Sequence, residues 1–367
     1  MDGLEVDNIA SVTNLNNTDI NAPVQENSDA SLFAYLFAGK LICSLGSALN
    51  IINILVLAQK ELSESPYVYL LALAVSDLTF LLLSLVHLIS YSISRSYYIA
   101  FFNAYIFFVI GNICFNASVW LIVFITIERL TFVVRPLQPK PSRKKALISI
   151  SVIVALATLI NIPRVFCFQI QEQDNIYYPN GTDFRESNTF LYLSWFHSVI
   201  INFIPNITLI LTNSVLIWTL KKAEHDRLVL RSNQAQAASR DQRRLTRMLV
   251  VIVIVFFFCT IPSAFSDDPI SHALFGKGKT WTEFVNSQGN VTLIYVSNLL
   301  LYTNSAMNFV LYCAFNRKFR DATKALFWTI TINVRRSVRN QTRNSTSEVY
   351  SSGERSPQVS NRINTKL

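Results

Sequence analysis

The chain has 367 residues, of which 51% are hydrophobic and 15% are charged, and its formal net charge is +9. This composition is too apolar for an ordinary soluble domain. The basic residues lie beside long apolar runs, so the positive charge indicates membrane topology, and no nucleic-acid partner is expected.

The first 32 residues are polar and rich in Asn, which predicts a disordered N-terminus at residues 1–32. They contain six acidic residues and no Lys or Arg, whereas the connections after the third and fifth apolar runs are basic. The positive-inside rule therefore predicts an extracellular N-terminus and a cytoplasmic C-terminus. This segment lacks the apolar core of a cleavable signal peptide.

Seven apolar runs follow, each long enough to cross a hydrocarbon core of about 30 Å as a helix. They predict an all-α membrane protein, a seven-transmembrane helix bundle that occupies residues 33–315. The predicted spans, numbered one to seven, are residues 33–58, 67–91, 101–134, 146–168, 190–220, 245–265 and 291–313.

Basic residues surround Phe319, Leu326 and Phe327 directly after span seven. This pattern predicts a short amphipathic helix at residues 316–328 that lies along the inner leaflet. The remaining residues, 329–367, are rich in Ser, Thr and Asn and predict a disordered cytoplasmic tail.

The predicted outer side carries three sequons that are expected to be glycosylated, at Asn16, Asn180 and Asn290. All five cysteines fall in spans or at their ends, and the outer connection at 169–188 contains none. No extracellular disulfide is therefore proposed. The same connection contains a turn signal and can cover a cavity.

Asp77 lies in the middle of span two, among apolar residues. A carboxylate at the centre of a membrane costs roughly 2.5–3.5 kcal/mol, so it is expected to face the protein interior and to have a function. The alternative is a protonated Asp77 that only hydrogen-bonds a neighbouring helix.

Span seven carries a polar stripe, because Asn304, Asn308 and Tyr312 are spaced i, i+4, i+8 and lie on one helical face. Such a stripe in a membrane helix must face polar partners inside the bundle. Spans one and three offer Asn50 and Ser118 as partners.

In this order and spacing, these motifs resemble the rhodopsin-like (class A) G-protein-coupled receptors over roughly residues 33–328. The Asn308-Phe-Val-Leu-Tyr312 form is similar to invertebrate neuropeptide receptors of the FMRFamide and myosuppressin kind, and also to nematode chemoreceptors. The resemblance is carried by Asn50, Asp77 with its neighbours Leu71–Leu78, Glu128-Arg129-Leu130 with Pro136, Pro205, Phe256 with Pro262, and Asn304-Ser305, Asn308 and Tyr312.

The resemblance implies a plasma-membrane receptor that transmits the binding of an extracellular peptide or small molecule to heterotrimeric G proteins. It also admits receptor kinases and arrestin as partners. Asp77 would be the centre of a buried pocket for an allosteric sodium ion, the one cofactor that the resemblance suggests. The residues of this sodium pocket would be Asn50, Asp77, Ser118, Asn304, Ser305 and Asn308.

The resemblance also implies a switch, in which Arg129 holds the cytoplasmic end closed against Glu128 and then moves toward the G protein. The other switch residues would be Pro205, Phe256, Pro262 and Tyr312.

Several positions depart from the family pattern. Ala104 stands where span three usually has the cysteine of the outer disulfide, and Thr260 where span six usually has Trp. Asn213 replaces a Tyr of span five, and Gln242 replaces an acid that often pairs with the Arg of span three. These departures leave open an atypical receptor with weak G-protein coupling.

The ligand is expected in the outer half of the bundle. Gly111, at the position where amine receptors have Asp, argues against a monoamine, and span seven has no Lys for a retinal Schiff base. The candidate ligand-binding residues are His87, Tyr91, Gly111, Asn112, Phe115, His197, Ser263, Asp267, Asn298 and Tyr302.

Asp267 and its neighbour Asp268 are candidates to bind a basic group, such as the Arg of an Arg-Phe-amide peptide. The alternative is that both acids cap a helix end or face solvent. Arg164, near the outer end of span four, can extend its side chain toward the membrane surface.

Three classes therefore compete: a neuropeptide receptor, a chemosensory receptor for a small environmental molecule, and a transporter or channel. The absence of an internal repeat, and of intramembrane charge beyond Asp77, disfavours the transporter. The sequence has no set of nucleophile, base and orienting group, so no enzyme is expected.

Overall fold

The computed structural model describes residues 26–91, 96–135, 142–173, 175–227, 250–329, 331–332 and 335–336. The expectations for Asn16, Pro136, Gln242 and most of both predicted tails lie outside these residues. The chain divides into two units, Met1–Phe319 and Arg320–Leu367. The first unit contains the helix bundle and both sites described below.

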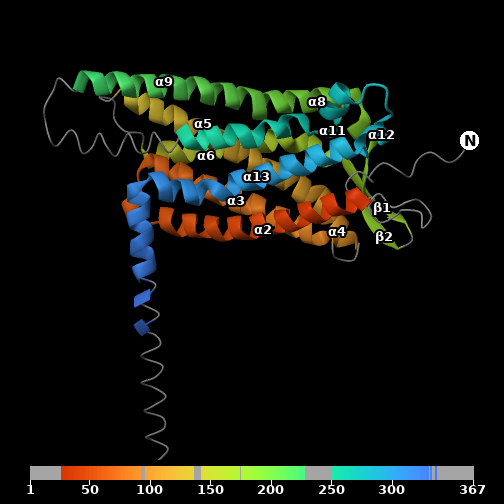
Figure 1. Ribbon diagram of the computed structural model, residues 1–367, viewed down its shortest axis with the longest axis horizontal. Helices are drawn as coiled ribbons and strands as arrows, with labels where there is room; N and C mark the ends of the chain where they lie inside the picture. The colour runs from red at the N-terminus through yellow and green to blue at the C-terminus, as the bar shows by residue number, and fades with distance from the viewer. Residues whose placement is uncertain are drawn as a thin grey trace, which may run out of the picture. The chain divides into compact units, whose positions relative to one another are not determined.

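Long helices run side by side through the first unit (Figure 1). The first four predicted spans correspond to helices α2 to α6 and their short extensions. Their bounds are α2 Glu26–Leu57, η2 Lys60–Leu62, α3 Ser65–Ser90, α4 Tyr97–Phe101, η3 Phe102–Gly111, α5 Asn112–Val134, α6 Arg143–Asn161 and η4 Ile162–Phe166.

The second half of the bundle contains spans five to seven and two short helices between spans six and seven. Its elements are α7 Asp183–Glu186, α8 Asn188–Ser198, η5 Val199–Phe203, α9 Ile204–Arg227, the helix Val250–Phe265 with its final turn η6 Pro262–Phe265, α11 Asp268–Phe275, α12 Trp281–Val285 and α13 Gln288–Phe315. Residues 317–329 are also helical.

Among the described residues, five helices are long and apolar enough to cross a membrane, and they correspond to predicted spans one to five. Span six is broken: Val250–Phe265 and α11 meet at an angle of 73°, and as one bent span they would make the sixth. Span seven is the continuous 28-residue helix α13. It is not among the five helices that are apolar enough, because it contains several polar side chains.

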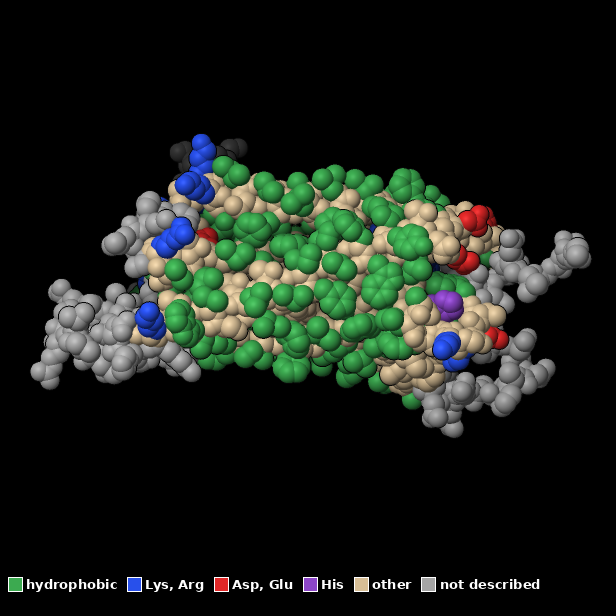
Figure 2. Space-filling view, turned by 90° about the horizontal axis from the view of Figure 1, so that it is seen from above, with side chains coloured by type: hydrophobic (Ala, Val, Ile, Leu, Met, Phe, Trp, Pro, Cys, Tyr) green, Lys and Arg blue, Asp and Glu red, His purple; other side chains and the backbone are tan. Residues whose placement is uncertain are grey.

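The apolar surface of the bundle indicates lipid contact. Large side chains such as Phe33 and Leu211 are more than half exposed, while Asn50 and Asn116 are fully buried. Figure 2 shows hydrophobic side chains covering the middle of this face and charged side chains gathered at its two ends. A soluble protein rarely exposes such a continuous apolar band.

One feature departs from the all-α expectation. The connection after span four folds into an antiparallel hairpin of β1 (Phe168–Gln173) and β2 (Ile176–Gly181), paired from Phe168↔Gly181 to Gln173↔Ile176. The turn contains Asn175 with φ 61°, a conformation that Asn tolerates well. The hairpin lies at one end of the bundle beside α4, and we call this the hairpin end (Figure 1).

Non-covalent contacts attach the hairpin to the bundle, since all five cysteines are free. Tyr105 donates a hydrogen bond to the backbone oxygen of Phe168 at 2.9 Å. The Phe168 ring packs edge-on against Phe108 at 4.8 Å, and the Arg185 guanidinium lies over the same ring at 4.6 Å.

Spans three and five each contain π-helical turns, η3 and η5. π-Helical segments are rare and occur frequently at functional sites. Both border the cavity described below: η3 contributes Asn103 and Phe107 to its wall, and η5 contributes Ile201 and Asn202.

Candidate functional site

A cavity of about 420 Å³ lies at the hairpin end of the bundle, under β1 and β2. All ten residues that the sequence predicted as ligand contacts line it. Those residues are His87, Tyr91, Gly111, Asn112, Phe115, His197, Ser263, Asp267, Asn298 and Tyr302. The structure thus brings together side chains from five predicted spans.

One side of the cavity is formed by a hydrogen-bonded group on spans two and three. His87 Nδ1 lies 2.9 Å from Asn103 Oδ1, and Asn103 Nδ2 donates to Ser90 Oγ at 3.2 Å. The His87 ring stacks on Phe107 at 4.0 Å. Asn103 was not a sequence candidate, although Asn103, Phe107 and Gly111 are spaced i, i+4, i+8 and could have been found by that spacing.

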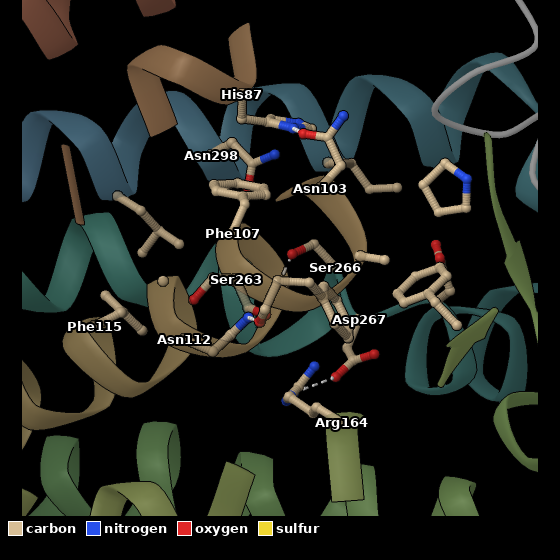
Figure 3. A pocket seen from close by; sticks show the side chains of 18 of the residues that line it. His87, Asn103, Phe107, Asn112, Phe115, Arg164, Ser263, Ser266, Asp267 and Asn298 are labelled. Carbon is tan, nitrogen blue, oxygen red and sulfur yellow. Dashed lines mark hydrogen bonds and ion pairs between the residues drawn. The ribbon is translucent and has the colours of Figure 1, made fainter. Parts of the chain in front are cut away.

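The opposite side contains an ion pair (Figure 3). Arg164 Nη2 lies 3.2 Å from Asp267 Oδ2, and the exposed fractions of these side chains are 9% and 24%. The Arg164 side chain therefore does not extend toward the membrane surface: it turns inward, because a carboxylate is available there.

Asp268 forms a second ion pair, with Arg185 at 2.7 Å. Its other carboxylate oxygen accepts a hydrogen bond from Asn290 Nδ2 at 3.5 Å. Asp267 and Asp268 are therefore not equivalent. Both carboxylate oxygens of Asp268 are engaged, whereas Asp267 uses one oxygen for Arg164, keeps the other for a ligand and is partly open to the cavity. The alternative that both acids face solvent does not hold, but both do lie at a helix end: Asp267 is the N-cap residue of α11, without a side-chain capping hydrogen bond, and Asp268 is in its first turn.

Asn290 is buried, which counts against it as a glycosylation site. Its Oδ1 accepts a hydrogen bond from Ser271 at 2.8 Å, and its Nδ2 donates to Val285 O at 3.3 Å as well as to Asp268. A glycan on this amide nitrogen would break the hydrogen bonds that it donates and would not fit at the buried position. Asn180 lies in β2 and is half-buried, so it remains a candidate.

A second polar cluster surrounds Asp77, which is almost completely buried. Ser118 and Ser305 donate to its Oδ1 at 2.9 and 3.0 Å, and Asn308 donates to its Oδ2 at 2.6 Å. Asn50 joins indirectly, because its Nδ2 donates to the backbone oxygen of Ser305 at 2.9 Å. The structure thus brings together five of the six residues assigned to the sodium pocket.

Asn304, the sixth residue, is buried but is not among the donors to Asp77. The cluster is rich in oxygen, with one carboxylate and two hydroxyls that can also turn a lone pair toward a cation. Oxygen ligands with a single negative charge fit a hard monovalent ion. The described residues contain no group of three or more His, Cys, Asp and Glu side chains that could hold a metal.

The far end of span three differs from the expectation. Glu128 accepts a hydrogen bond from Ser65 at 3.2 Å, and the ion pairs of the described residues do not include one between Glu128 and the buried Arg129. Neighbouring residues on a helix point in different directions, so Glu128 is closer to the start of α3. Tyr312 is fully buried against Phe319, with ring centroids 5.4 Å apart.

Spans five and six meet through a polar stripe that the sequence reasoning missed. Asn206 Nδ2 donates to Thr260 Oγ1 at 3.3 Å, and Asn202 Nδ2 donates to Ser198 Oγ at 3.3 Å. Ser198, Asn202 and Asn206 have the same i, i+4, i+8 spacing that identified the stripe of span seven. Thr260, at the position of the missing Trp, is thus part of a polar contact.

The remaining switch candidates surround this contact. Phe256 is fully buried one turn before Thr260, whose Oγ1 also donates to the Phe256 backbone oxygen at 2.9 Å. Pro205 lies at the start of α9, directly before Asn206, and Pro262 begins the turn η6.

Residues 49–312 match the family described as 7 transmembrane receptor (rhodopsin family). The match covers well over half of the chain, so the chain belongs to this family. It is a G-protein-coupled receptor and a multi-pass membrane protein, and the family is one of receptors rather than enzymes.

The relatives of this chain include several peptide receptors. The FMRFamide receptor of Drosophila melanogaster is 26% identical over 338 residues, which cover 84% of this chain but only 56% of that receptor. The neuromedin-U receptor 2 of Mus musculus is 28% identical, covering 77% of this chain and 72% of that receptor. The tachykinin-like peptides receptor 99D of Drosophila melanogaster is 23% identical, covering 88% and 62%.

These matches confirm the resemblance drawn from the motifs. The family assignment and the presence of neuropeptide receptors among the relatives agree with the sequence interpretation.

Proposed function

We propose that this receptor binds a basic, amidated neuropeptide in the cavity at the hairpin end and transmits the binding to a heterotrimeric G protein. One observation carries the proposal: Asp267 presents a carboxylate oxygen to a cavity that is also lined by many aromatic side chains. Three relatives named after peptides support the same class of ligand.

Asp267 is suited to bind the guanidinium or ammonium group of a ligand. Its Oδ2 binds Arg164, so a ligand cation would share the carboxylate and use Oδ1. Charge-assisted hydrogen bonds of this kind are about twice as strong as neutral ones. Asp268, which is occupied by Arg185 and Asn290, would shape the site instead of binding the ligand.

The aromatic walls suit a Phe side chain beside the basic group. Phe80 and Phe115 pack at 5.8 Å, Phe80 and Tyr302 also at 5.8 Å, and all three line the cavity. Asn298 and Asn112 add amide groups that can bind a peptide backbone or a terminal amide.

The hairpin end would face the outside of the cell and the other end the cytoplasm, in agreement with the basic residues after spans three and seven. The helical residues 317–329 would then form the amphipathic helix on the inner leaflet. Arg129 and Tyr312 would lie on the G-protein side, where receptor kinases and arrestin also act.

The Asp77 cluster would hold a sodium ion in the resting receptor through Asp77, Ser118 and Ser305, with Asn50 and Asn308 fixing their positions. The ion would supply a positive charge that neutralises the buried carboxylate. Ligand binding would be coupled to the rearrangement of these hydrogen bonds.

The test is a screen of amidated peptides against cells that express the receptor, with a G-protein readout. FMRFamide is compared with its citrulline analogue, which replaces the Arg guanidinium by a neutral group of the same shape. The matched variants are Asp267→Asn and Asp268→Asn. We expect Asp267→Asn to weaken FMRFamide about tenfold or more and the citrulline analogue much less.

Equal losses for the two peptides in Asp267→Asn would refute the role of Asp267 as the site of the Arg guanidinium. Asp268→Asn should weaken both peptides alike, because it changes the shape of the site and not its contact with the ligand cation.

A chemosensory role is the second candidate. A cavity of about 420 Å³ is within the range of small-molecule sites, about 300–1,000 Å³. Expression confined to sensory endings, together with activation by small odorants and not by peptides, would favour it.

A further inference from the structure

His197 connects the cavity to the interior of the bundle. Its Nδ1 lies 3.3 Å from Arg164 Nη2, and its Nε2 lies 3.0 Å from the side-chain amide of Asn116. Arg164 Nη2 is the same nitrogen that binds Asp267 at 3.2 Å. Three contacts therefore run from the carboxylate in the cavity wall, through spans four and five, to span three.

The chemistry of Arg164 fixes the state of the His197 ring. A guanidinium only donates hydrogen bonds, so Nδ1 of His197 must accept one and the proton of the neutral ring lies on Nε2. The two hydrogens on Arg164 Nη2 then serve two acceptors, Asp267 Oδ2 and His197 Nδ1.

This tautomer determines how the Asn116 amide is oriented. In the structure the amide nitrogen of Asn116 faces Nε2 of His197. With the ring proton on Nε2, two hydrogen-bond donors would face each other. The amide oxygen of Asn116 meanwhile is buried and has no hydrogen-bond partner. Exchanging the amide oxygen and nitrogen resolves both problems, because Nε2–H of His197 then donates to Oδ1 of Asn116.

We propose that Arg164, His197 and Asn116 form a polar link through which a cation bound at Asp267 acts on span three beside the Asp77 cluster. The proposal rests on the proposed function in taking the ligand to be basic. A ligand cation that shares Asp267 draws the carboxylate away from Arg164, which alters the hold of Arg164 on His197 and of His197 on Asn116.

Asn116, at the inner end of the link, lies close in the chain to residues of both the cavity wall and the Asp77 cluster. Asn116 is fully buried and lies between Phe115, which lines the cavity, and the residues leading to Ser118, which donates to Asp77. A small rotation of span three at Asn116 would therefore change both the aromatic wall and the Asp77 cluster. The link offers a path from cavity to interior in a receptor that has Thr260 in place of the span-six Trp.

The first measurement needs no ligand. The chain has four histidines, so ring ¹⁵N signals of histidine-labelled receptor in nanodiscs can be assigned by comparison with His197→Gln. We expect His197 to be protonated on Nε2, and Asn116→Ala to shift that signal while leaving the His87 signal unchanged. An Nδ1–H tautomer, or a His197 signal unmoved by Asn116→Ala, would overturn the proposal.

The second measurement separates binding from signalling, with FMRFamide as the probe. We expect Asn116→Ala to lower maximal G-protein activation about tenfold while changing FMRFamide affinity by less than about threefold, as a coupling residue should. The matched control is Asn161→Ala, since Asn161 is equally buried in span four but contacts Ala157 of its own helix. It should alter neither quantity.

Failure of the polar link and failure of the proposed ligand class give different experimental results. A proportional loss of affinity and activation in Asn116→Ala would make Asn116 an ordinary part of the binding site and overturn the link. If FMRFamide fails to bind the wild-type receptor, the proposed ligand class fails for that peptide, and the tautomer measurement by itself decides the link.

Discussion

Replacing Arg185 by Gln should release the hairpin from the bundle. The Arg185 guanidinium binds Asp268 at 2.7 Å and covers the Phe168 ring at 4.6 Å, and the two paired side chains are only 15% and 10% exposed. Removing one partner of a buried ion pair costs about 3–5 kcal/mol. The pair is partly exposed and Gln keeps some of the contacts of Arg185, so we expect the hairpin to lose about 2 kcal/mol of its stability.

A loss of that size is measurable as local opening. Each 1.4 kcal/mol corresponds to about a factor of ten, so amide hydrogens of β1 and β2 should exchange with deuterium roughly 30-fold faster in Arg185→Gln. Amides of α3 and α5 should exchange at the wild-type rate. Mass spectrometry of receptor in detergent would report both regions in one experiment.

The control uses an exposed ion pair. Lys318 and Glu64 lie 3.2 Å apart with exposed fractions of 51% and 43%, so Glu64→Gln should change local exchange by less than about fivefold. Unchanged exchange of the hairpin in Arg185→Gln would refute the reasoning, and Tyr105 and Phe108 would then be sufficient to hold the hairpin.

Two further predictions concern the interior and the glycans. Asp77→Asn should abolish the dependence of agonist affinity on sodium concentration, measured by replacing sodium with a large organic cation; a retained dependence would exclude Asp77 as the ion site. Asn180→Gln should remove one glycan, seen as a faster-migrating band that shifts less on glycosidase treatment because the predicted glycan at Asn16 remains, whereas Asn290→Gln should leave the glycan count unchanged. A glycan lost in Asn290→Gln would show that Asn290 is glycosylated, and that the buried hydrogen bonds of its amide nitrogen do not form in the mature receptor.

The sequence predicted those parts of the structure that depend on periodicity. Asn308 and Ser305 meet Asp77 because residues on one face of a membrane helix must find polar partners, and few such partners exist in an apolar bundle. The same rule would have found Ser198, Asn202 and Asn206, had the spacing been searched in span five.

The parts that the sequence did not predict depend on which neighbour a side chain meets. Arg164 at the end of a span can extend to the membrane surface or turn inward, and only the position of Asp267 decides between the two. The sequon at Asn290 identifies a candidate glycosylation site. Whether its side chain is buried depends on Ser271 and Asp268, which lie on a different helix.

The hairpin also has a redox consequence. Because every cysteine is free, a reducing agent has no bond to cut between the hairpin and span three, and oxidation is not needed to form this part of the receptor. Its attachment depends on an ion pair and on an edge-on contact between two aromatic rings, which are non-covalent and reversible. Thiol reagents that inactivate disulfide-dependent receptors should therefore leave the cover of this cavity in place, whereas low pH weakens its attachment by protonating Asp268. Added salt should have a smaller effect, because a largely buried ion pair is screened little.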